Sequence, residues 1–251
     1  MWLRLRQIAF VAQRLEPVEE ALIDILGLQV CFRDPGVSVF GLHNALFPVG
    51  NQFIEVVAPT DPNQDTAGAR YLSRRSGDGG YMVITQCDDQ APRRDRLNNL
   101  GVRLVTDYQG SSFVNMQLHP KDTGGSFFEM DEMLGPNAHE VDGPWHPAGP
   151  NWQKTKTNRV AGIVGATIQC DDPRRVAKRW SEISEIVLEN DTLALSNANL
   201  RFVPISDGRP EGLSELNLKA DIDSVTNAAD KRGMRSGDSQ VTICGMRLNL
   251  V

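Results

Sequence analysis

The sequence has little cysteine and no long apolar run. Its four cysteines lie far apart, with no Cys-x-x-Cys spacing, and Cys87 and Cys170 end apolar runs that resemble buried strands. We therefore expect reduced core thiols, because neither a zinc knuckle nor a disulfide framework has this pattern. No apolar run approaches the ~20 residues of a membrane-spanning helix, so we expect no membrane partner. The chain passes from Met1 directly into a strand pattern rather than the core of a signal peptide, which favours a cytoplasmic protein.

Acidic residues outnumber basic ones, and histidine is scarce. The 251 residues carry a formal net charge of −6, and a nucleic-acid partner is not expected because neutralising phosphates needs a basic face. Two of the four histidines, His139 and His146, fall in or near a stretch rich in proline and glycine, so we do not expect an iron site built from two histidines and one carboxylate. The chain is 40% hydrophobic and 23% charged, an ordinary globular mixture, and it is long enough for two domains.

What the sequence does contain is a repeat. The string Gln-Cys-Asp-Asp occurs at residues 86–89 and again at 169–172, each time after a short apolar run and before a helix start containing Pro-Arg-Arg. Similar strand-then-helix patterns begin at Ile8 and Leu216. In the first two units the same number of residues separates the strand from the glycine expected to end the helix. This agreement favours four copies of one supersecondary unit over a single domain whose steps resemble each other through polarity patterning alone.

After each of the first two helices, the chain returns to short β-patterned runs. These runs are 30–32, 37–42 and 53–57 in the first unit and 102–106, 113–118 and 127–130 in the second. Each unit therefore reads βαβββ, and the predicted fold class is α+β with tandem βαβββ units. The third unit is short, and the fourth has no clean turn before its last strand. Residues 59–80 are expected to form a loop that joins the first two units and borders a pocket.

Proline and glycine divide the chain into two parts. Residues 136–159 cannot continue a helix or a central strand. We therefore predict a first domain over 1–135, a linker over 136–159 and a second domain over 160–251. Trp145 and Trp152 are expected to pin the linker to the body of the protein rather than to form a ligand box.

Two stretches carry a resemblance to a known superfamily. Residues 5–11, Leu-Arg-Gln-Ile-Ala-Phe-Val, open the first unit, and residues 118–129, Leu-His-Pro-Lys-Asp-Thr-Gly-Gly-Ser-Phe-Phe-Glu, close the second. With the paired βαβββ units, they resemble the vicinal oxygen chelate superfamily, which includes glyoxalase I, methylmalonyl-CoA epimerase, the extradiol dioxygenases and the bleomycin-resistance proteins. The second stretch is most similar to the epimerase branch. The resemblance is good over residues 3–133 and weak over 160–251, and it implies glyoxalase-like, cup-shaped mixed sheets.

The resemblance implies a set of metal ligands. In that superfamily two paired units usually place four ligands around one divalent ion, and Gln7, Glu55 and Glu129 match three of these positions. Tyr81 stands where the fourth ligand is usually histidine, and a neutral phenol, which ionises near pH ~10, is a poor ligand. The remaining oxygen-only set suits Mg²⁺ or Mn²⁺, leaves Ni²⁺ or Co²⁺ open and disfavours zinc.

Three further side chains are candidates for binding or catalysis. Tyr81 is a weak ligand, a hydrogen-bond donor to a substrate oxygen or a core aromatic residue, and the sequence leaves these roles open. His43 is expected on the third strand, where it either binds substrate inside the cup or is a satisfied strand histidine. His119, which precedes Pro120, is either an acid–base group or an exposed turn residue.

The second domain offers weaker ligands at the corresponding positions. These positions are Ile163, Arg201, Ser214 and Asn249. We therefore expect a degenerate glyoxalase-like domain with a structural or substrate-capping role.

Two classes of function remain open for a protein that binds a small molecule as a monomer or homodimer. The first is a lyase or isomerase that acts on a small oxygenated metabolite and moves a proton with Glu55 or Glu129, with a divalent ion stabilising the intermediate. The second is a metal-free binding or sequestration protein of the bleomycin-resistance type, in which Glu55 or Glu129 pairs with a cation.

Overall fold

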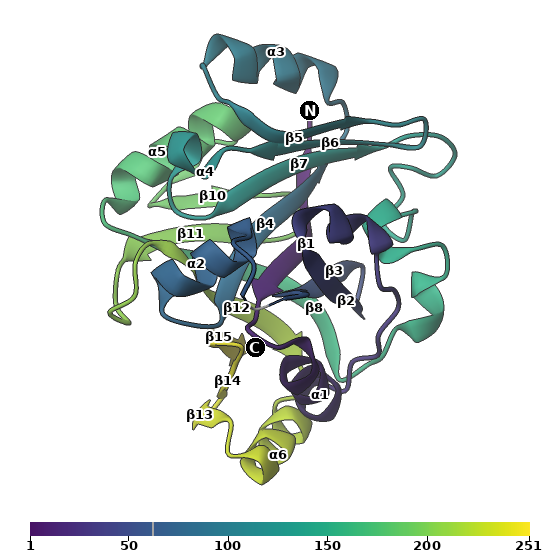
Figure 1. The fold of residues 1–251 in the computed structure, drawn as a ribbon, viewed down its shortest axis with the longest axis vertical. Coiled ribbons are helices and arrows are strands. Elements are labelled where there is room, and N and C mark those ends of the chain that lie inside the picture. The colour runs from purple at the N-terminus through teal and green to yellow at the C-terminus, as the bar shows by residue number, and fades with distance from the viewer. Residues whose placement is uncertain (62) are drawn as a thin grey trace.

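The protein contains two mixed β-sheets with helices packed against them (Figure 1). It is described here by a computed structural model that covers residues 1–61 and 63–251. The seven-stranded sheet has the order β2-β3-β1-β4-β7-β6-β5, and the eight-stranded sheet has the order β13-β14-β15-β12-β8-β11-β10-β9. This architecture confirms the predicted α+β fold of tandem units in two domains.

The first sheet contains the first two units. Its strands are β1 (Leu3–Val11), β2 (Leu42–Val49), β3 (Gln52–Pro59), β4 (Gly79–Cys87), β5 (Leu104–Gln109), β6 (Phe113–Leu118) and β7 (Phe127–Met133). Its helices are α1 (Leu15–Leu26), α2 (Ala67–Arg75), α3 (Ala91–Asn99) and α4 (Pro120–Thr123). Strands β1 and β4 pair antiparallel, so the two units close on each other within residues 3–133, as expected.

The second sheet contains the third and fourth units. Its strands are β8 (Val160–Cys170), β9 (Leu188–Glu189), β10 (Thr192–Ala194), β11 (Asn199–Pro204), β12 (Gly212–Ala220), β13 (Arg235–Gly237), β14 (Gln240–Ile243) and β15 (Met246–Leu250). Its helices are α5 (Pro173–Ser184) and α6 (Ile222–Arg232). The segment between the sheets contains two short 3₁₀ helices, at His146–Ala148 and Trp152–Thr155.

The first unit departs from the predicted pattern. The expected strand at 37–42 is a 3₁₀ helix over Pro35–Phe40, because the side chain of Asp34 accepts a hydrogen bond from the Gly36 amide and Pro35 suits a first helical position. The expected strand at 30–32 contributes only an isolated bridge between Phe32 and Leu46. Both expectations were wrong, and β2 begins where the predicted strand was to end.

The prediction of a loop over 59–80 was also only partly right, because helix α2 lies within this segment. Thr66 precedes this helix, and its side chain accepts a hydrogen bond of 3.0 Å from the Ala69 amide. Such an N-cap satisfies one of the free amides at a helix start. The helix is short, and Tyr71 and Leu72 are the large apolar residues that it buries, so few apolar positions marked it in the sequence.

Each face of the first sheet has a distinct core. Ile8 and Phe10 of β1 face α1 and join one large cluster, which we call the outer-face core. Ala9 and Val11 point the other way and join a second cluster, the inner-face core, because side chains alternate along a strand. The outer-face core contains residues of both domains, so the domains pack together through their helix-covered faces, with α1 beside α6 and α3 beside α5 (Figure 1).

The interface between the domains is nearly symmetric. The Gln52 side chain donates to the Ile163 carbonyl (2.7 Å) and accepts from the Ile163 amide (2.8 Å). In the other direction, the Asn197 side chain pairs in the same way with the Leu5 amide (2.8 Å) and carbonyl (2.9 Å). Leu5 and Ile163 lie beside bulges of β1 and β8, where the ladder leaves backbone groups unpaired. This two-fold arrangement agrees with duplication of a whole domain.

The repeated Gln-Cys-Asp-Asp string marks strand ends. Cys87 and Cys170 are buried and free, as expected for core thiols. Asp172 caps α5 by accepting a hydrogen bond from the Arg175 amide. Within the described residues, no helix is long and apolar enough to cross a membrane.

Candidate functional site

The structure brings Gln7 and Glu55 together on the inner face of the first sheet. The Gln7 amide nitrogen donates to Glu55 Oε2 at 2.8 Å. Asn44 of β2 donates to the other carboxylate oxygen, Glu55 Oε1, at 2.6 Å. Both oxygens of Glu55 therefore accept a hydrogen bond from a neutral amide, and no cation among the described residues forms an ion pair with it.

Burial changes the acidity of Glu55. Its side chain is only 7% exposed, and desolvation raises its pKa to about 7, although the hydrogen bonds from Asn44 and Gln7 oppose that shift. A carboxyl group that titrates near neutral pH can both accept and return a proton, which is the property required of a general base.

Glu129 and Asp131 form a second acidic element two residues apart on β7. Period-two alternation places both on the inner face, and Asn115 of β6 donates to Asp131 Oδ1 at 3.2 Å. Desolvation is the main cause that raises the pKa of Glu129 to about 7, and the nearby Glu55 charge raises it further. Burial and the Glu129 charge raise the pKa of Asp131 well above its ordinary value. The pair is therefore expected to retain a proton near neutral pH.

Tyr81 lies on an aromatic wall of the same face. A bulge in the β1–β4 ladder leaves Tyr81 as an extra residue, so Tyr81 and Met82 both join the inner-face core. Its ring lies 4.9 Å from that of Tyr71 and 5.0 Å from that of Phe127. Burial raises the pKa of the Tyr81 phenol, which keeps it neutral. This environment favours the core or hydrogen-bonding role of Tyr81 over the ligand role.

A segment of the linker covers part of the inner face. Residues 138–152, which we call the strap, place Trp145 and Trp152 in the inner-face core, each 1% exposed. Trp145 stacks on Phe53 with centroids 6.5 Å apart, and Trp152 meets the same ring edge-on at 5.0 Å. The prediction that these tryptophans pin the linker to the body of the protein is confirmed, and the surface to which they are pinned is the expected ligand cup.

Polar side chains of β1 and β4 hold the backbone of the strap. Arg4 donates to the carbonyls of His139 (3.3 Å) and Glu140 (2.8 Å), and Gln86 donates to that of Ala138 (2.8 Å). The glutamine of the repeated string therefore has a structural role that its sequence position did not reveal.

Arg6 is the most deeply buried cation of the inner face. A bulge between Leu5 and Gln7 turns Arg6 inward, where its guanidinium donates to the carbonyls of Val141 (2.8 Å) and Gly143 (2.9 Å) in the strap. It also lies 5.5 Å from the ring centroids of Phe53, Trp145 and Trp152. Burial lowers its pKa to about 9. The inner-face arginines are thus engaged by the strap and do not pair with Glu55.

The orientation of Gln7 bears directly on metal binding. The Trp145 indole nitrogen, which can only donate, makes a 2.7 Å hydrogen bond to Gln7 Oε1. The amide oxygen is therefore turned to the strap, and the amide nitrogen faces Glu55. A cation shared by Gln7 and Glu55 would need the opposite orientation, so these residues, as arranged, do not fit a divalent ion. Among the described residues, no three His, Cys, Asp or Glu side chains are grouped to hold a metal.

The two histidine candidates of the first domain do not reach this site. His43 precedes Asn44 on β2, and Asn44 faces Glu55 on the inner face. Because side chains alternate along a strand, the His43 side chain points toward the outer face. His119 caps α4, where its Nδ1 accepts a hydrogen bond from the Lys121 amide at 3.2 Å. The substrate-binding role of His43 and the catalytic role of His119 are corrected accordingly.

The four positions of the second domain also form no acidic site. Ile163 belongs to the outer-face core, so that assignment was on the wrong face. The Ser214 hydroxyl donates to the Thr167 carbonyl, Arg201 is exposed, and Asn249 donates to Glu215 Oε2 at 3.1 Å.

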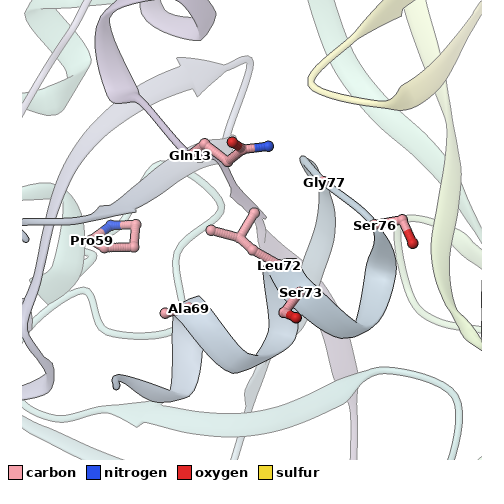
Figure 2. Close-up of a pocket in the computed structure, with 7 residues that line it drawn as sticks. All are labelled: Gln13, Pro59, Ala69, Leu72, Ser73, Ser76 and Gly77. Atoms are coloured by element: carbon pink, nitrogen blue, oxygen red, sulfur yellow. The ribbon is translucent and has the colours of Figure 1, made fainter. Parts of the chain in front are cut away.

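A cavity of about 340 Å³ opens where β1 and β3 end, against helix α2 (Figure 2). Its lining includes Gln13, Pro59, Leu72, Ser73 and Ser76. Leu72 also belongs to the inner-face core that contains Tyr81, so this side chain lies between the cavity and the aromatic wall. The loop expected to border a pocket does so, and Gly77 of this loop is among the lining residues.

Sequence reasoning missed Asn44, Asn115 and Asp131, and it missed the contact of Trp145 with Gln7. Side chains alternate along a strand, so the position of Glu129 could have predicted that Asp131, two residues later, lies on the same face. No local signal pointed to Trp145, which meets Gln7 across 138 positions of the chain.

Among the solved structures that this chain resembles, one aligns over the whole chain and two others over about half of it. A hypothetical protein from Staphylococcus aureus aligns with a TM-score of 0.66 and 13% identity, covering 100% of this chain and 99% of that one. Methylmalonyl-CoA epimerase from Mycobacterium tuberculosis aligns with a TM-score of 0.45 and 27% identity, over 52% of this chain and 88% of that one. The epimerase from Streptomyces coelicolor in complex with 2-nitronate-propionyl-CoA gives a TM-score of 0.47 and 19% identity, over 54% and 100%.

The family comparison covers most of the chain. No curated protein matches. Residues 8–184 match the family described as a glyoxalase-like domain, a span that includes the first sheet, the strap and the start of the second domain. The chain therefore belongs to the glyoxalase-like domain family.

Proposed function

We propose that the protein is an isomerase or lyase that moves a proton on a small oxygenated molecule, with Glu55 as the general base. The proposal rests on Glu55, a buried carboxylate that accepts hydrogen bonds from two side-chain amides. Burial raises the pKa of this carboxyl to about 7. Such a group matches the pKa that proton abstraction near neutral pH requires.

The neighbouring groups have complementary roles in this proposal. Glu55 takes the proton from a carbon next to a carbonyl, and the electron pair of that C–H bond moves to the carbonyl oxygen. The protonated Glu129–Asp131 pair donates a hydrogen bond to this oxygen, where negative charge develops. Return of the proton to another carbon, or to the opposite face of the same carbon, completes an isomerisation, and loss of a leaving group from the next carbon completes a lyase reaction. No step uses a metal ion, because the Gln7 orientation does not supply its ligand set.

The strap limits the substrate to a small molecule. It covers the part of the inner face around Phe53, while Glu55 and Glu129 remain 7% and 8% exposed. We propose that the substrate enters past Leu72 from the adjacent cavity, whose volume of about 340 Å³ suits a metabolite of that size.

The test is hydrogen–deuterium exchange at carbon. Purified protein is incubated in D₂O with small 2-oxo acids, 1,3-dicarbonyl compounds and 2-hydroxy ketones, and deuterium incorporation is followed by NMR. We expect exchange into at least one class, its loss in Glu55→Gln, and its retention in Glu215→Gln, a control in the second domain. Exchange that survives Glu55→Gln would reject the assignment of the base.

A second candidate is a metal-free binding protein, favoured by the aromatic wall of Tyr71, Tyr81 and Phe127 beside buried carboxyls. Saturable binding of a compound without any deuterium exchange would favour this function over catalysis. In either case we propose a small-molecule partner and a monomer or homodimer, which sedimentation analysis distinguishes.

A further inference from the structure

We propose that Trp145 prevents divalent cations from binding on the inner face of the first sheet by holding the side-chain oxygen of Gln7 away from Glu55. The strap thereby converts a surface whose residues match a ligand set into one that works without metal. The inference concerns cation binding alone and does not rest on the proton transfer proposed above.

The hydrogen bond from Trp145 fixes the orientation of the Gln7 amide. An indole N–H has no acceptor capacity, so the group 2.7 Å from Trp145 Nε1 must be the oxygen of the Gln7 amide. This requirement assigns the other end of the amide as nitrogen, and its N–H contacts Glu55 Oε2 at 2.8 Å. The three residues form a directed chain in which each hydrogen bond sets the direction of the next.

Reversal of the Gln7 amide is unfavourable while Trp145 is present. It would bring the amide N–H against the indole N–H and the amide oxygen against the Glu55 carboxylate, in a site from which water is nearly excluded. Gln7 is 2% exposed, so solvent cannot replace the lost hydrogen bonds. A cation would relieve only the second of these conflicts, because the two donors would still face each other.

Removal of the indole N–H should therefore release the amide. In Trp145→Phe the ring still fills most of the space against Phe53, but Gln7 Oε1 loses its partner. A hard cation placed between this oxygen and Glu55 then satisfies both groups, with Glu129 on the same face as a further oxygen ligand.

Trp152 supplies a matched control within the same strap. It is as buried as Trp145, packs on the same Phe53 ring, and lies at the same 5.5 Å distance from the Arg6 guanidinium. Its indole nitrogen has no hydrogen-bond partner in the part of the chain that the structure describes. Trp152→Phe therefore changes the packing of the strap in a similar way without altering the orientation of Gln7.

The experiment is a titration of the full chain with Mn²⁺, in which the electron paramagnetic resonance signal reports free metal. We expect Trp145→Phe to bind one Mn²⁺ on the order of tenfold to a hundredfold more tightly than wild type, while Trp152→Phe remains like wild type. The added Glu55→Gln substitution should abolish the gain. Equal affinity in wild type and Trp145→Phe would overturn the proposal, as would a tight Mn²⁺ site in wild type that Glu55→Gln removes.

A second variant guards against misfolding of Trp145→Phe. Gln7→Glu retains Trp145 and gives its indole an acceptor, while the second oxygen of the introduced carboxylate faces Glu55. This variant should also gain Mn²⁺ binding, and thermal denaturation checks that each protein is folded. If Trp145→Phe is unfolded, the outcome with Gln7→Glu decides, and absence of a gain there rejects the proposal.

Discussion

The inner faces of the two domains differ although both sheets are built from the same repeated unit. In the first domain, aromatic rings are buried beneath the strap, and the carboxyls of Glu55, Glu129 and Asp131 are buried on the same face of the sheet. In the second domain, Arg201, Thr167, Glu215 and Arg247 follow one another in register across four strands, and Arg247 pairs with Glu215 at 2.6 Å. Charges there neutralise each other near solvent, whereas Glu55, Glu129 and Asp131 form no ion pair with any described residue.

This comparison indicates that the two domains share a scaffold, while among the described residues only the first domain has carboxyls whose pKa is raised by burial. The glutamines of the two Gln-Cys-Asp-Asp strings illustrate the shared part. The Gln86 side chain donates a hydrogen bond to the Ala138 carbonyl of the strap, and the Gln169 side chain donates one of 2.6 Å to Asp207 Oδ1 of a loop. Both glutamines secure a neighbouring segment, but only in the first domain does that segment lead on into buried tryptophans.

The largest effect should come from removing the proposed base. Glu55→Gln retains the shape of the side chain and should lower any proton-transfer rate by about 10²–10⁴-fold. The measurement is the initial rate of deuterium incorporation under saturating substrate. The corresponding change in the second domain, Glu215→Gln, should leave the rate unchanged, and an equal loss in both variants would remove the functional distinction between the domains.

Stability should fall as pH rises, because burial raises the pKa of Glu55 from 4.5 in the unfolded chain to about 7 in the folded protein. The folded state binds the extra proton, so its contribution is fully present below pH ~4.5 and is lost as pH rises through ~7. The loss attributable to Glu55 should be about 3 kcal/mol. Urea denaturation from pH 4.5 to 8 measures it, and Glu55→Gln should flatten the slope; an unchanged slope would contradict the assignment.

The strap should contribute to stability through specific hydrogen bonds. Trp145→Phe leaves the buried Gln7 oxygen without a donor and should lower the free energy of unfolding by about 1–3 kcal/mol. Trp152→Phe removes an indole nitrogen that has no partner and should cost less. Denaturant titrations of both variants test the order, and the reverse order would show that packing rather than hydrogen bonding dominates.

The smallest effect should come from the open face of the second domain. Arg201 is exposed, so Arg201→Ala should change the free energy of unfolding by less than about 0.5 kcal/mol and leave deuterium exchange unaltered. A marked loss of exchange in this variant would instead assign the second domain a part in binding substrate.

The repeat unit and much of the inner face were accessible from the sequence because they follow local rules. Strand patterning and equal spacing set the register of the units, the resemblance to the vicinal oxygen chelate superfamily matched Glu55 and Glu129 to one site, and glycine marked the end of α1, where Gly27 has a φ of 67°. The same rules failed at His43 because a 3₁₀ helix displaced the strand by several residues, and a one-residue error in register reverses the face.

The amino-acid sequence by itself determined the duplicated α+β architecture and the presence of carboxylates on apolar strands, since both depend on periodicities of two to four residues. Only the tertiary structure decided what surrounds those carboxylates. The bulge at Arg6, the Asn44 contact and the Trp145–Gln7 hydrogen bond arise from how strands and linker pack together. Contacts between distant residues depend on the closed fold, because burial and hydrogen-bond direction exist only once the segments meet.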